Sequence, residues 1–141
     1  MDIKGIGTSI IECPRIGKMV EHHGELFLRR VYTEREIRFC QSRKHAIEYF
    51  SGRWAAKEAI LKALGTNWTR GVAWTDIEVR DAPGGQYRVL VGGGAKGATI
   101  RAGIGDILVS ISQCRTYATA SALTVSARSR GPVEPGPPSE C

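Results

Sequence analysis

Residues 52–65, GRWAAKEAILKALG, form the segment that most constrains how this chain can fold. Their composition is typical of a helix. At about 100° per residue, Ala56 and Ile60 lie on one side of that helix, and Trp54 and Leu61 lie on another. A helix that is apolar on nearly every side is buried, either by the rest of its own fold or by a second subunit. The sequence therefore predicts a largely buried helix rather than an amphipathic surface helix.

Four charged residues interrupt this apolar surface: Arg53, Lys57, Glu58 and Lys62. Charges on a buried helix are costly unless they are paired or bound to a ligand. One interpretation is that Glu58 and Lys62, at positions i and i+4, form an ordinary surface pair. The other is that the carboxylate binds a hard cation and the three cations bind phosphate, which would suit a magnesium–diphosphate complex. The spacing alone leaves both interpretations open.

Short strands and helices follow one another irregularly along the chain, which favours an α+β fold over a doubly wound one. Apolar β-branched runs predict strands, and Thr33 with Glu36 has the sequence pattern of a helix capping box. The predicted elements are a strand at 3–11, a helix from Pro14 to about Gly24, a helix of about two turns from Thr33, a long helix at about 45–64 ending at Gly65, a hairpin of strands 76–80 and 87–91, a short helix at about 95–102, and a hairpin of strands 107–114 and 117–125.

The chain of 141 residues is long enough for one domain with a core and too short for two ordinary domains. We expect that domain over residues 1–125. Residues 126–141 are rich in Pro, Gly and Ser, so a disordered tail is expected there. The sequence has no apolar run near the length of a membrane span, and its N-terminus lacks the layout of a signal peptide. These features predict a cytoplasmic protein without membrane contact.

The net charge of +6 favours an anionic partner. A nucleic acid is one candidate. However, no basic–aromatic motif of a known RNA-binding module is present, and Trp68 and Trp74 lie in an apolar segment where packing is their usual role. We therefore expect no nucleic-acid partner.

The four cysteines are Cys13, Cys40, Cys114 and Cys141. They are too widely spaced for a paired-thiol zinc site. Free thiols are therefore expected.

The helix segment resembles the signature of the holo-acyl-carrier-protein synthases, the small bacterial 4′-phosphopantetheinyl transferases. In that family G-R-[FW]-A-A-K-E-A is followed by K-A-L-G, as it is here. Further segments are similar to family segments and occur in the expected order: GIGTSIIECPRI, RRVYTEREIRFC, DIEV and SIS. The similarity covers about residues 3–123.

This resemblance implies an enzyme that transfers the 4′-phosphopantetheine group of coenzyme A to a serine of apo-acyl carrier protein. The reaction is magnesium-dependent, releases adenosine 3′,5′-bisphosphate and supports fatty acid biosynthesis. The resemblance also implies a small α+β subunit that forms a homotrimer, with active sites at the subunit interfaces.

The resemblance implies a role for individual residues as well. Glu58 matches a magnesium ligand, and Lys62 matches a residue that contacts the diphosphate. Lys44 and Arg53 match positions that hold the nucleotide and its 3′-phosphate. Arg15 matches a basic residue that meets the acidic carrier protein. No residue can be identified as the general base from the sequence.

Three positions depart from the family pattern. Ser9 stands where the family has a second carboxylate ligand, and a unit charge at 4 Å is worth about 4 kcal/mol at an effective dielectric near 20. Asp2 and Glu12 lie an odd number of residues from Ser9, so on a regular strand they face the other way. Gln113 replaces a His near the coenzyme A 3′-phosphate, and Tyr87 replaces a Pro near the adenine.

Two readings of these departures remain open. In the first, the chain is an active enzyme whose hydroxyl at Ser9 gives weaker metal binding and whose Gln113 gives a weaker nucleotide contact. In the second, it is a catalytically impaired paralogue that keeps the binding of coenzyme A or acyl carrier protein.

Overall fold

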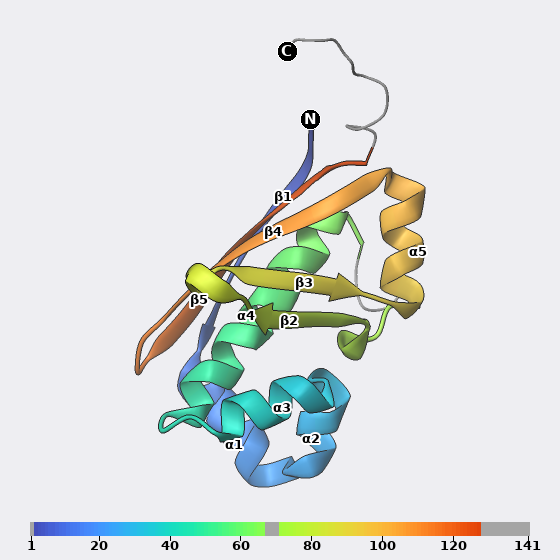
Figure 1. Cartoon of the computed structure of the whole chain (residues 1–141). Coiled ribbons are helices and arrows are strands. Elements are labelled where there is room, and N and C mark those ends of the chain that lie inside the picture. Colours follow the sequence, from blue (N-terminus) through green and yellow to red (C-terminus); the bar gives the residue numbers. More distant parts are fainter. Residues whose placement is uncertain (1, 67–70, 128–141) are drawn as a thin grey trace.

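The computed structural model describes residues 2–66 and 71–127, and it has the α+β architecture that the sequence predicts (Figure 1). A long helix, α4, packs against a three-stranded antiparallel sheet and also contacts a two-stranded hairpin. The elements in chain order are β1 (Ile3–Glu12), α1 (Cys13–His23), α2 (Glu25–Val31), α3 (Glu34–Gln41), α4 (Ala46–Leu64), β2 (Ile77–Asp81), β3 (Tyr87–Val91), α5 (Gly93–Ala102), β4 (Ile104–Gln113) and β5 (Tyr117–Ser126).

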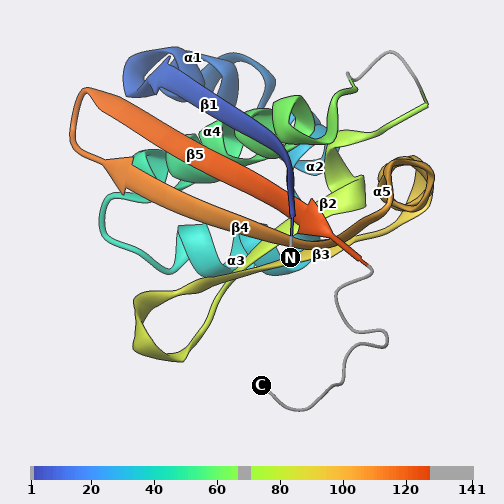
Figure 2. The same cartoon turned by 90° about the horizontal axis from the view of Figure 1, so that it is seen from above.

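The larger sheet has the strand order β1-β5-β4, and β2 with β3 forms the smaller one. Figure 2 shows α4 along one face of the larger sheet. Both predicted hairpins are antiparallel pairs, so those predictions are confirmed. Several boundaries differ: Asp76 lies in a short 3-10 turn before β2, β4 begins at Ile104 rather than at residue 107, and Ser126 belongs to β5 rather than to the predicted tail. Residues 128–141 of that tail lie outside the described residues.

Helix α4 is the central element of the fold, and it is largely buried, as predicted. Twelve of its 19 residues are buried, and it contacts α1, α3 and β2 as well as all three strands of the larger sheet. A single chain therefore buries it without a second subunit. The helix ends at Gly65, whose left-handed conformation has a φ of 75°. Neither α4 nor any other described helix is long and apolar enough to cross a bilayer.

Strand β1 approaches α4 closely because two of its residues are glycines. A Cβ atom at Gly5 would collide with the carbonyl oxygen of Ala63, and one at Gly7 would collide with that of Ala59. Thr124 of β5 donates a hydrogen bond to the same Ala63 oxygen at 3.1 Å. The alanines of the helix and the glycines of the strand together allow the two backbones to touch.

Helix α2 has no counterpart among the predicted elements. Gly24 ends α1 with a φ of 51°, and the chain turns directly into seven helical residues. Phe27, Leu28 and Val31 of this helix are buried in the core. Since isolated helices this short are unstable, tertiary packing rather than a local start signal accounts for α2.

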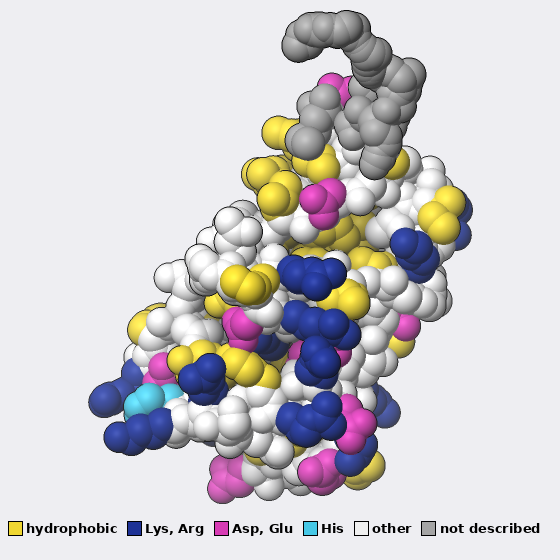
Figure 3. Space-filling model, viewed as in Figure 1, with side chains coloured by type: hydrophobic (Ala, Val, Ile, Leu, Met, Phe, Trp, Pro, Cys, Tyr) yellow, Lys and Arg dark blue, Asp and Glu magenta, His cyan; other side chains and the backbone are white. Residues whose placement is uncertain are grey.

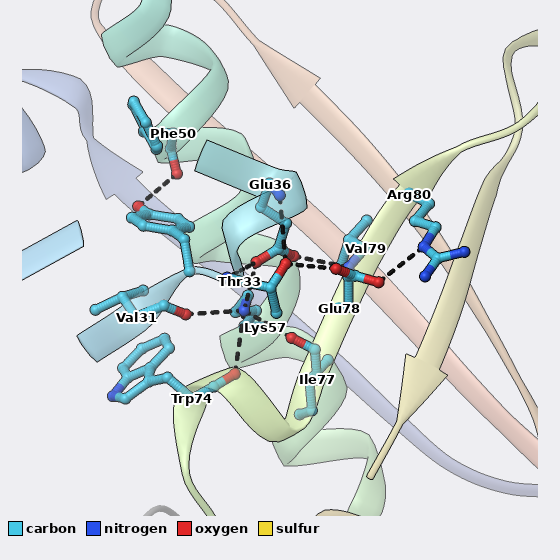
Figure 4. A network of polar contacts seen from close by, with 11 residues as sticks. Val31, Thr33, Glu36, Phe50, Lys57, Trp74, Ile77, Glu78, Val79 and Arg80 are labelled. Atoms are coloured by element: carbon cyan, nitrogen blue, oxygen red, sulfur yellow. Dashed lines mark hydrogen bonds and ion pairs between the residues drawn. The ribbon is translucent and has the colours of Figure 1, made fainter. Parts of the chain in front are cut away.

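Lys57 of α4 is fully buried and paired with Glu36 of α3 at 2.8 Å (Figure 4). Its ammonium group also donates hydrogen bonds to the backbone carbonyls of Val31, Trp74 and Ile77, at 2.8, 3.1 and 2.6 Å. Burial lowers the pKa of Lys57, although the nearby Glu36 carboxylate acts in the opposite direction. The interpretation in which all three cations of the helix bind phosphate therefore does not hold for Lys57, because its donors hold the fold together.

Glu36 connects the same cation to two other elements. It accepts a hydrogen bond from the backbone N–H of Thr33 at 2.9 Å, which completes the predicted capping box of α3. Its other oxygen accepts from the backbone N–H of Val79 in β2 at 2.7 Å. Lys57 and Glu36 therefore join α2, α3 and β2 to the central helix.

Replacing Lys57 by Met should lower the free energy of unfolding by about 3–5 kcal/mol, because the Glu36 carboxylate then stays buried without its cation. The Lys57→Met/Glu36→Leu double variant should recover part of that loss. Urea unfolding followed by circular dichroism measures both effects. Arg29→Gln is the control: it breaks an exposed ion pair with Glu25 and should cost less than about 1 kcal/mol. A Lys57→Met variant as stable as this control would contradict the account.

Candidate active site

An open pocket of about 460 Å³ lies where α4 meets β1 and β5. It brings together three predicted site residues: Ser9 from β1, and Glu58 and Lys62 from α4. Glu58 and Lys62 share one side of the helix because they are one turn apart. Ser9 shares the inward-facing side of β1 with Gly7 and Ile11. The close packing of β1 on α4 therefore places a hydroxyl beside a carboxylate and an ammonium group.

Lys62 is held at the edge of this pocket by the strand. Its ammonium group donates a hydrogen bond to the backbone carbonyl of Thr8 at 2.9 Å, next to Ser9 in the chain. A lysine ammonium has three N–H donors, and within residues 2–66 and 71–127 only the Thr8 carbonyl takes one, so two can serve the oxygens of an anionic ligand. The exposed side chain of Lys62 is thus already positioned to receive an anion.

The pocket has both apolar and polar walls. Trp54, one turn before Glu58, lines it, and the Trp54 ring lies 5.4 Å from the ring of Trp74. Strand β5 contributes Thr119 and Ser121. One carboxylate, one ammonium group and several hydroxyls suit a polar anionic ligand better than an apolar one.

The oxygen atoms of this pocket fit magnesium if a bound anionic ligand supplies further oxygens. Glu58 is the one carboxylate among the described residues that line the pocket, and Ser9 adds a neutral hydroxyl. Asp2 and Glu12 do not line it, so they do not supply the carboxylate that Ser9 lacks. Nowhere in residues 2–66 and 71–127 do three His, Cys, Asp or Glu side chains gather to hold a metal. Magnesium commonly binds one or two carboxylates together with substrate phosphates, so the pocket fits a metal that is bound to a diphosphate.

Arg53 lies outside this pocket, in a second hollow that α4 also lines. Its side chain is 2% exposed, and its Nη2 donates to the Asp81 carboxylate at 3.0 Å. Its guanidinium group lies over the rings of Phe39 and Tyr87, at centroid distances of 4.7 and 5.4 Å. A separation of five residues along the helix directs Arg53 and Glu58 to different sides.

The other predicted site residues also lie away from Glu58. Lys44 is exposed in the turn between α3 and α4, and Arg15 is exposed on α1. Gln113, the last residue of β4, packs so closely on Gly52 that a Cβ there would collide with its side chain. A single chain therefore does not gather all the predicted site residues in one pocket.

The cysteines are free thiols where the structure describes them, as predicted. Cys13 and Cys40 are buried and Cys114 is exposed. Burial raises the pKa of Cys40 to about 12, so this residue remains a thiol at neutral pH. Cys141 lies outside the described residues.

Sequence reasoning did not find the acidic partners of the two buried cations. Glu36 was recognised only as part of a capping box, a local pattern that accounts for its bond to Thr33. Its pairing with Lys57 joins residues 21 positions apart. Asp81, the partner of Arg53, ends a strand and carries no recognisable signal. Ion pairs between residues far apart in the sequence leave no local sequence pattern, so only the structure reveals them.

A profile of the 4′-phosphopantetheinyl transferase superfamily matches residues 5–122. Among the relatives of this chain is the holo-[acyl-carrier-protein] synthase of Koribacter versatilis. The two sequences are 43% identical over 123 residues, which cover 86% of this chain and 97% of that protein.

Solved structures share the fold. The holo-[acyl-carrier-protein] synthase of Neisseria meningitidis superposes with a TM-score of 0.81 at 26% identity, covering 89% of this chain and 100% of that one. The synthase of Bacillus anthracis, solved in complex with CoA (3′,5′-ADP), superposes with a TM-score of 0.72 at 33% identity, covering 88% and 97%. The arrangement of helices and strands described above is therefore that of these enzymes.

Proposed function

The chain belongs to the holo-acyl-carrier-protein synthases of the 4′-phosphopantetheinyl transferase superfamily, and on that premise we propose how it works. It transfers 4′-phosphopantetheine from coenzyme A to a serine of apo-acyl carrier protein, depends on magnesium and releases adenosine 3′,5′-bisphosphate. The observation that carries this proposal is the single pocket lined by Ser9, Glu58 and Lys62.

In the transfer, the serine oxygen of the carrier gives up its proton to the solvent and forms a bond to the phosphorus that bears the pantetheine arm. The bond from that phosphorus to the bridging oxygen breaks, and adenosine 3′,5′-bisphosphate leaves with that oxygen. The negative charge on the diphosphate must be neutralised for this to occur. Glu58 and Ser9 would hold magnesium, which supplies part of that neutralisation. Lys62 donates to the phosphate oxygens, and its contact with Thr8 fixes where those oxygens lie.

The nucleotide end of coenzyme A is assigned to Lys44, Arg53 and Gln113. These residues lie away from the pocket of Glu58 in the same chain. An active site at the interface of a homotrimer would resolve this separation, because one subunit supplies the pocket and its neighbour supplies the nucleotide contacts.

The outer face of the β1-β5-β4 sheet supports such an assembly. Ile6, Leu123 and Leu108 are aligned across the three strands, and Ile6 and Leu108 are 68% and 51% exposed. Ile10 on the same side of β1 is 63% exposed. A row of exposed apolar side chains on a sheet marks an interaction surface.

The exposed Arg15 on α1 would meet the acidic carrier protein. Its positive charge attracts an acidic partner before contact is made. We assign the reaction to the cytoplasm and to fatty acid biosynthesis. The alternative is an impaired paralogue that binds coenzyme A or the carrier but transfers poorly. In that case the neutral hydroxyl of Ser9, in place of a carboxylate ligand, weakens the binding of the metal.

Incubation with coenzyme A, magnesium and an apo-acyl carrier protein should increase the mass of the carrier by one phosphopantetheine group, as measured by mass spectrometry. Glu58→Gln should lower kcat/KM by about 10²-fold, because the carboxylate next to the metal and diphosphate is lost. Glu48→Gln, on the same helix but outside the pocket, is the matched control. Full activity of Glu58→Gln would show that this residue has been assigned the wrong role.

Ser9→Asp should lower the magnesium concentration required for half-maximal activity by about tenfold or more, because it adds a charged ligand next to Glu58. Titration of the transfer rate with magnesium measures this effect. Thr75→Asp adds the same charge at an exposed position outside the pocket and should have no such effect. An inactive wild type with an active Ser9→Asp variant would favour the impaired paralogue. An unchanged magnesium dependence would remove Ser9 from the metal site.

Sedimentation equilibrium should give the mass of three chains for the wild type. Leu108→Asp should dissociate that assembly, because it places a charge in the middle of the apolar row. Ile100→Asp is the control, since Ile100 is 68% exposed on α5 rather than on the sheet. A trimer that survives Leu108→Asp would exclude this face as the interface.

A further inference from the structure

Two cysteines that the transfer reaction does not use meet at one end of the larger sheet. Cys13 is the first residue of α1, directly after β1, and Cys114 directly follows β4. They are 101 positions apart in the sequence, yet the Cys13 thiol donates a hydrogen bond to the backbone carbonyl of Cys114 at 3.5 Å. Figure 2 shows the turn between β4 and β5 beside the start of α1. The fold therefore brings two thiol-bearing residues into contact.

Backbone hydrogen bonds attach both cysteines to this end of the sheet. The N–H of Cys13 donates to the carbonyl of Thr116 at 2.8 Å, and the N–H of Cys114 donates to the carbonyl of Tyr117 at 2.9 Å. Thr116 and Tyr117 are neighbours in the chain. The approach of the two cysteines is therefore a property of the sheet and not of two freely moving side chains.

The two thiols differ in exposure, which gives them different parts in thiol–disulfide exchange. Cys114 is exposed in the turn, whereas Cys13 is 2% exposed. The sulfur of Cys114 accepts a hydrogen bond from the N–H of Tyr117 at 3.5 Å. Exchange begins at the thiol that an external disulfide can reach. Cys114 would therefore react first, and Cys13 would attack the product from inside the fold.

The separation of the two residues suits a bond between them. A disulfide joins cysteines whose Cα atoms lie about 4.4–6.8 Å apart. The sulfur of Cys13 is already 3.5 Å from a backbone atom of Cys114. Rotation of the exposed Cys114 side chain and a small shift of the turn would bring the sulfurs together. Turns at the tips of hairpins are among the parts of a fold that move most readily.

The surroundings of Cys114 are positively charged. Arg115 follows it in the turn and is exposed. Figure 3 shows Lys and Arg side chains at the lower left of the view, on the side of the molecule where the β4–β5 hairpin ends in Figure 1. Positive charge attracts an anionic reactant before contact is made. Glutathione disulfide, which carries a net negative charge at neutral pH, fits this surface.

We propose that Cys114 and Cys13 form a thiol–disulfide exchange site that reacts with a small anionic disulfide such as glutathione disulfide. The Cys114 thiolate attacks one sulfur of glutathione disulfide, which forms a mixed disulfide and releases one glutathione thiolate. The Cys13 thiolate then attacks the Cys114 sulfur, and the second glutathione thiolate leaves. The two cysteines lose two electrons and two protons in total, and one glutathione disulfide is reduced to two glutathione thiols.

The bond would displace the start of α1. Because Cys13 is buried and Cys114 is exposed, joining them draws the first turn of α1 toward the hairpin. Arg15 lies in that turn. The oxidised protein would therefore bind the acidic carrier more weakly. This consequence rests on the proposed transferase function, whereas the formation of the bond does not.

The bond is tested by incubating the full chain with glutathione disulfide, digesting it with trypsin without reduction and measuring the peptide masses. Trypsin cleaves after Lys and Arg, so Cys13 falls in the peptide 5–15 and Cys114 in the peptide 102–115. The wild type should give these two peptides joined, and dithiothreitol should separate them. Cys141→Ser, the matched control, should give the same joined pair.

Two variants test the order of the steps. Cys13→Ser should stop at the mixed disulfide, so that the peptide 102–115 carries one glutathione. Cys114→Ser should give neither product, because the exposed thiol is lost. Thermal melts confirm that each variant folds. The proposal is overturned if the wild type gives no joined pair, or if Cys114→Ser takes up glutathione at Cys13 as fast as Cys13→Ser does at Cys114.

Transfer kinetics test the effect on α1 separately. The oxidised wild type should show a KM for the carrier that is higher by about two- to fivefold, the equivalent of one exposed charge contact. Cys114→Ser treated in the same way should show no change. An unchanged KM in the joined protein would overturn the displacement of Arg15. Joined peptides in a protein that transfers nothing would support the exchange site and contradict the proposed function, and unjoined peptides in an active enzyme would overturn the exchange site alone.

Discussion

The close contact between β1 and α4 is the constraint on which the rest of the structure depends. Gly5 and Gly7 lie against the backbone of the helix at Ala63 and Ala59, where a single Cβ would collide with a carbonyl oxygen. This contact fixes the strand along the helix. As a result Ser9, the next inward-facing residue after Gly7, opens into the same pocket as the functional side chains of α4. The composition of one helix face and of one strand thus determines where the candidate active site forms.

The four charges of the alanine-rich helix divide into two kinds. Lys57 and Arg53 are buried, and each is paired with a carboxylate from another element, so Lys57 in particular binds the surrounding helices and hairpin to α4. Glu58 and Lys62 face β1 and β5, where they line a pocket. A single helix can carry both kinds because its neighbours differ on each side: a polar network with α3 and β2 on one, and strands β1 and β5 of the larger sheet on the other.

The sequence predicted those parts of the fold that have local signals. The central helix, the capping box at Thr33 and both hairpins were predicted correctly because alanine content, capping residues and turn residues act over a few positions. Helix α2 was missed because packing alone stabilises it. The resemblance to a family singled out Ser9, Glu58 and Lys62, which the structure brings together. The acceptors of Lys57 depend on contacts between distant segments, which no spacing in the sequence reveals.

The most direct test of the central claim is a crystal structure of the protein grown with coenzyme A and manganese, which replaces magnesium and scatters anomalously. The account predicts an anomalous peak between the Glu58 carboxylate and the Ser9 hydroxyl. It also predicts that the diphosphate oxygens lie within hydrogen-bond distance of the Lys62 ammonium group. A manganese ion bound elsewhere, or a diphosphate that does not contact Lys62, would contradict the assignment of this pocket as the active site.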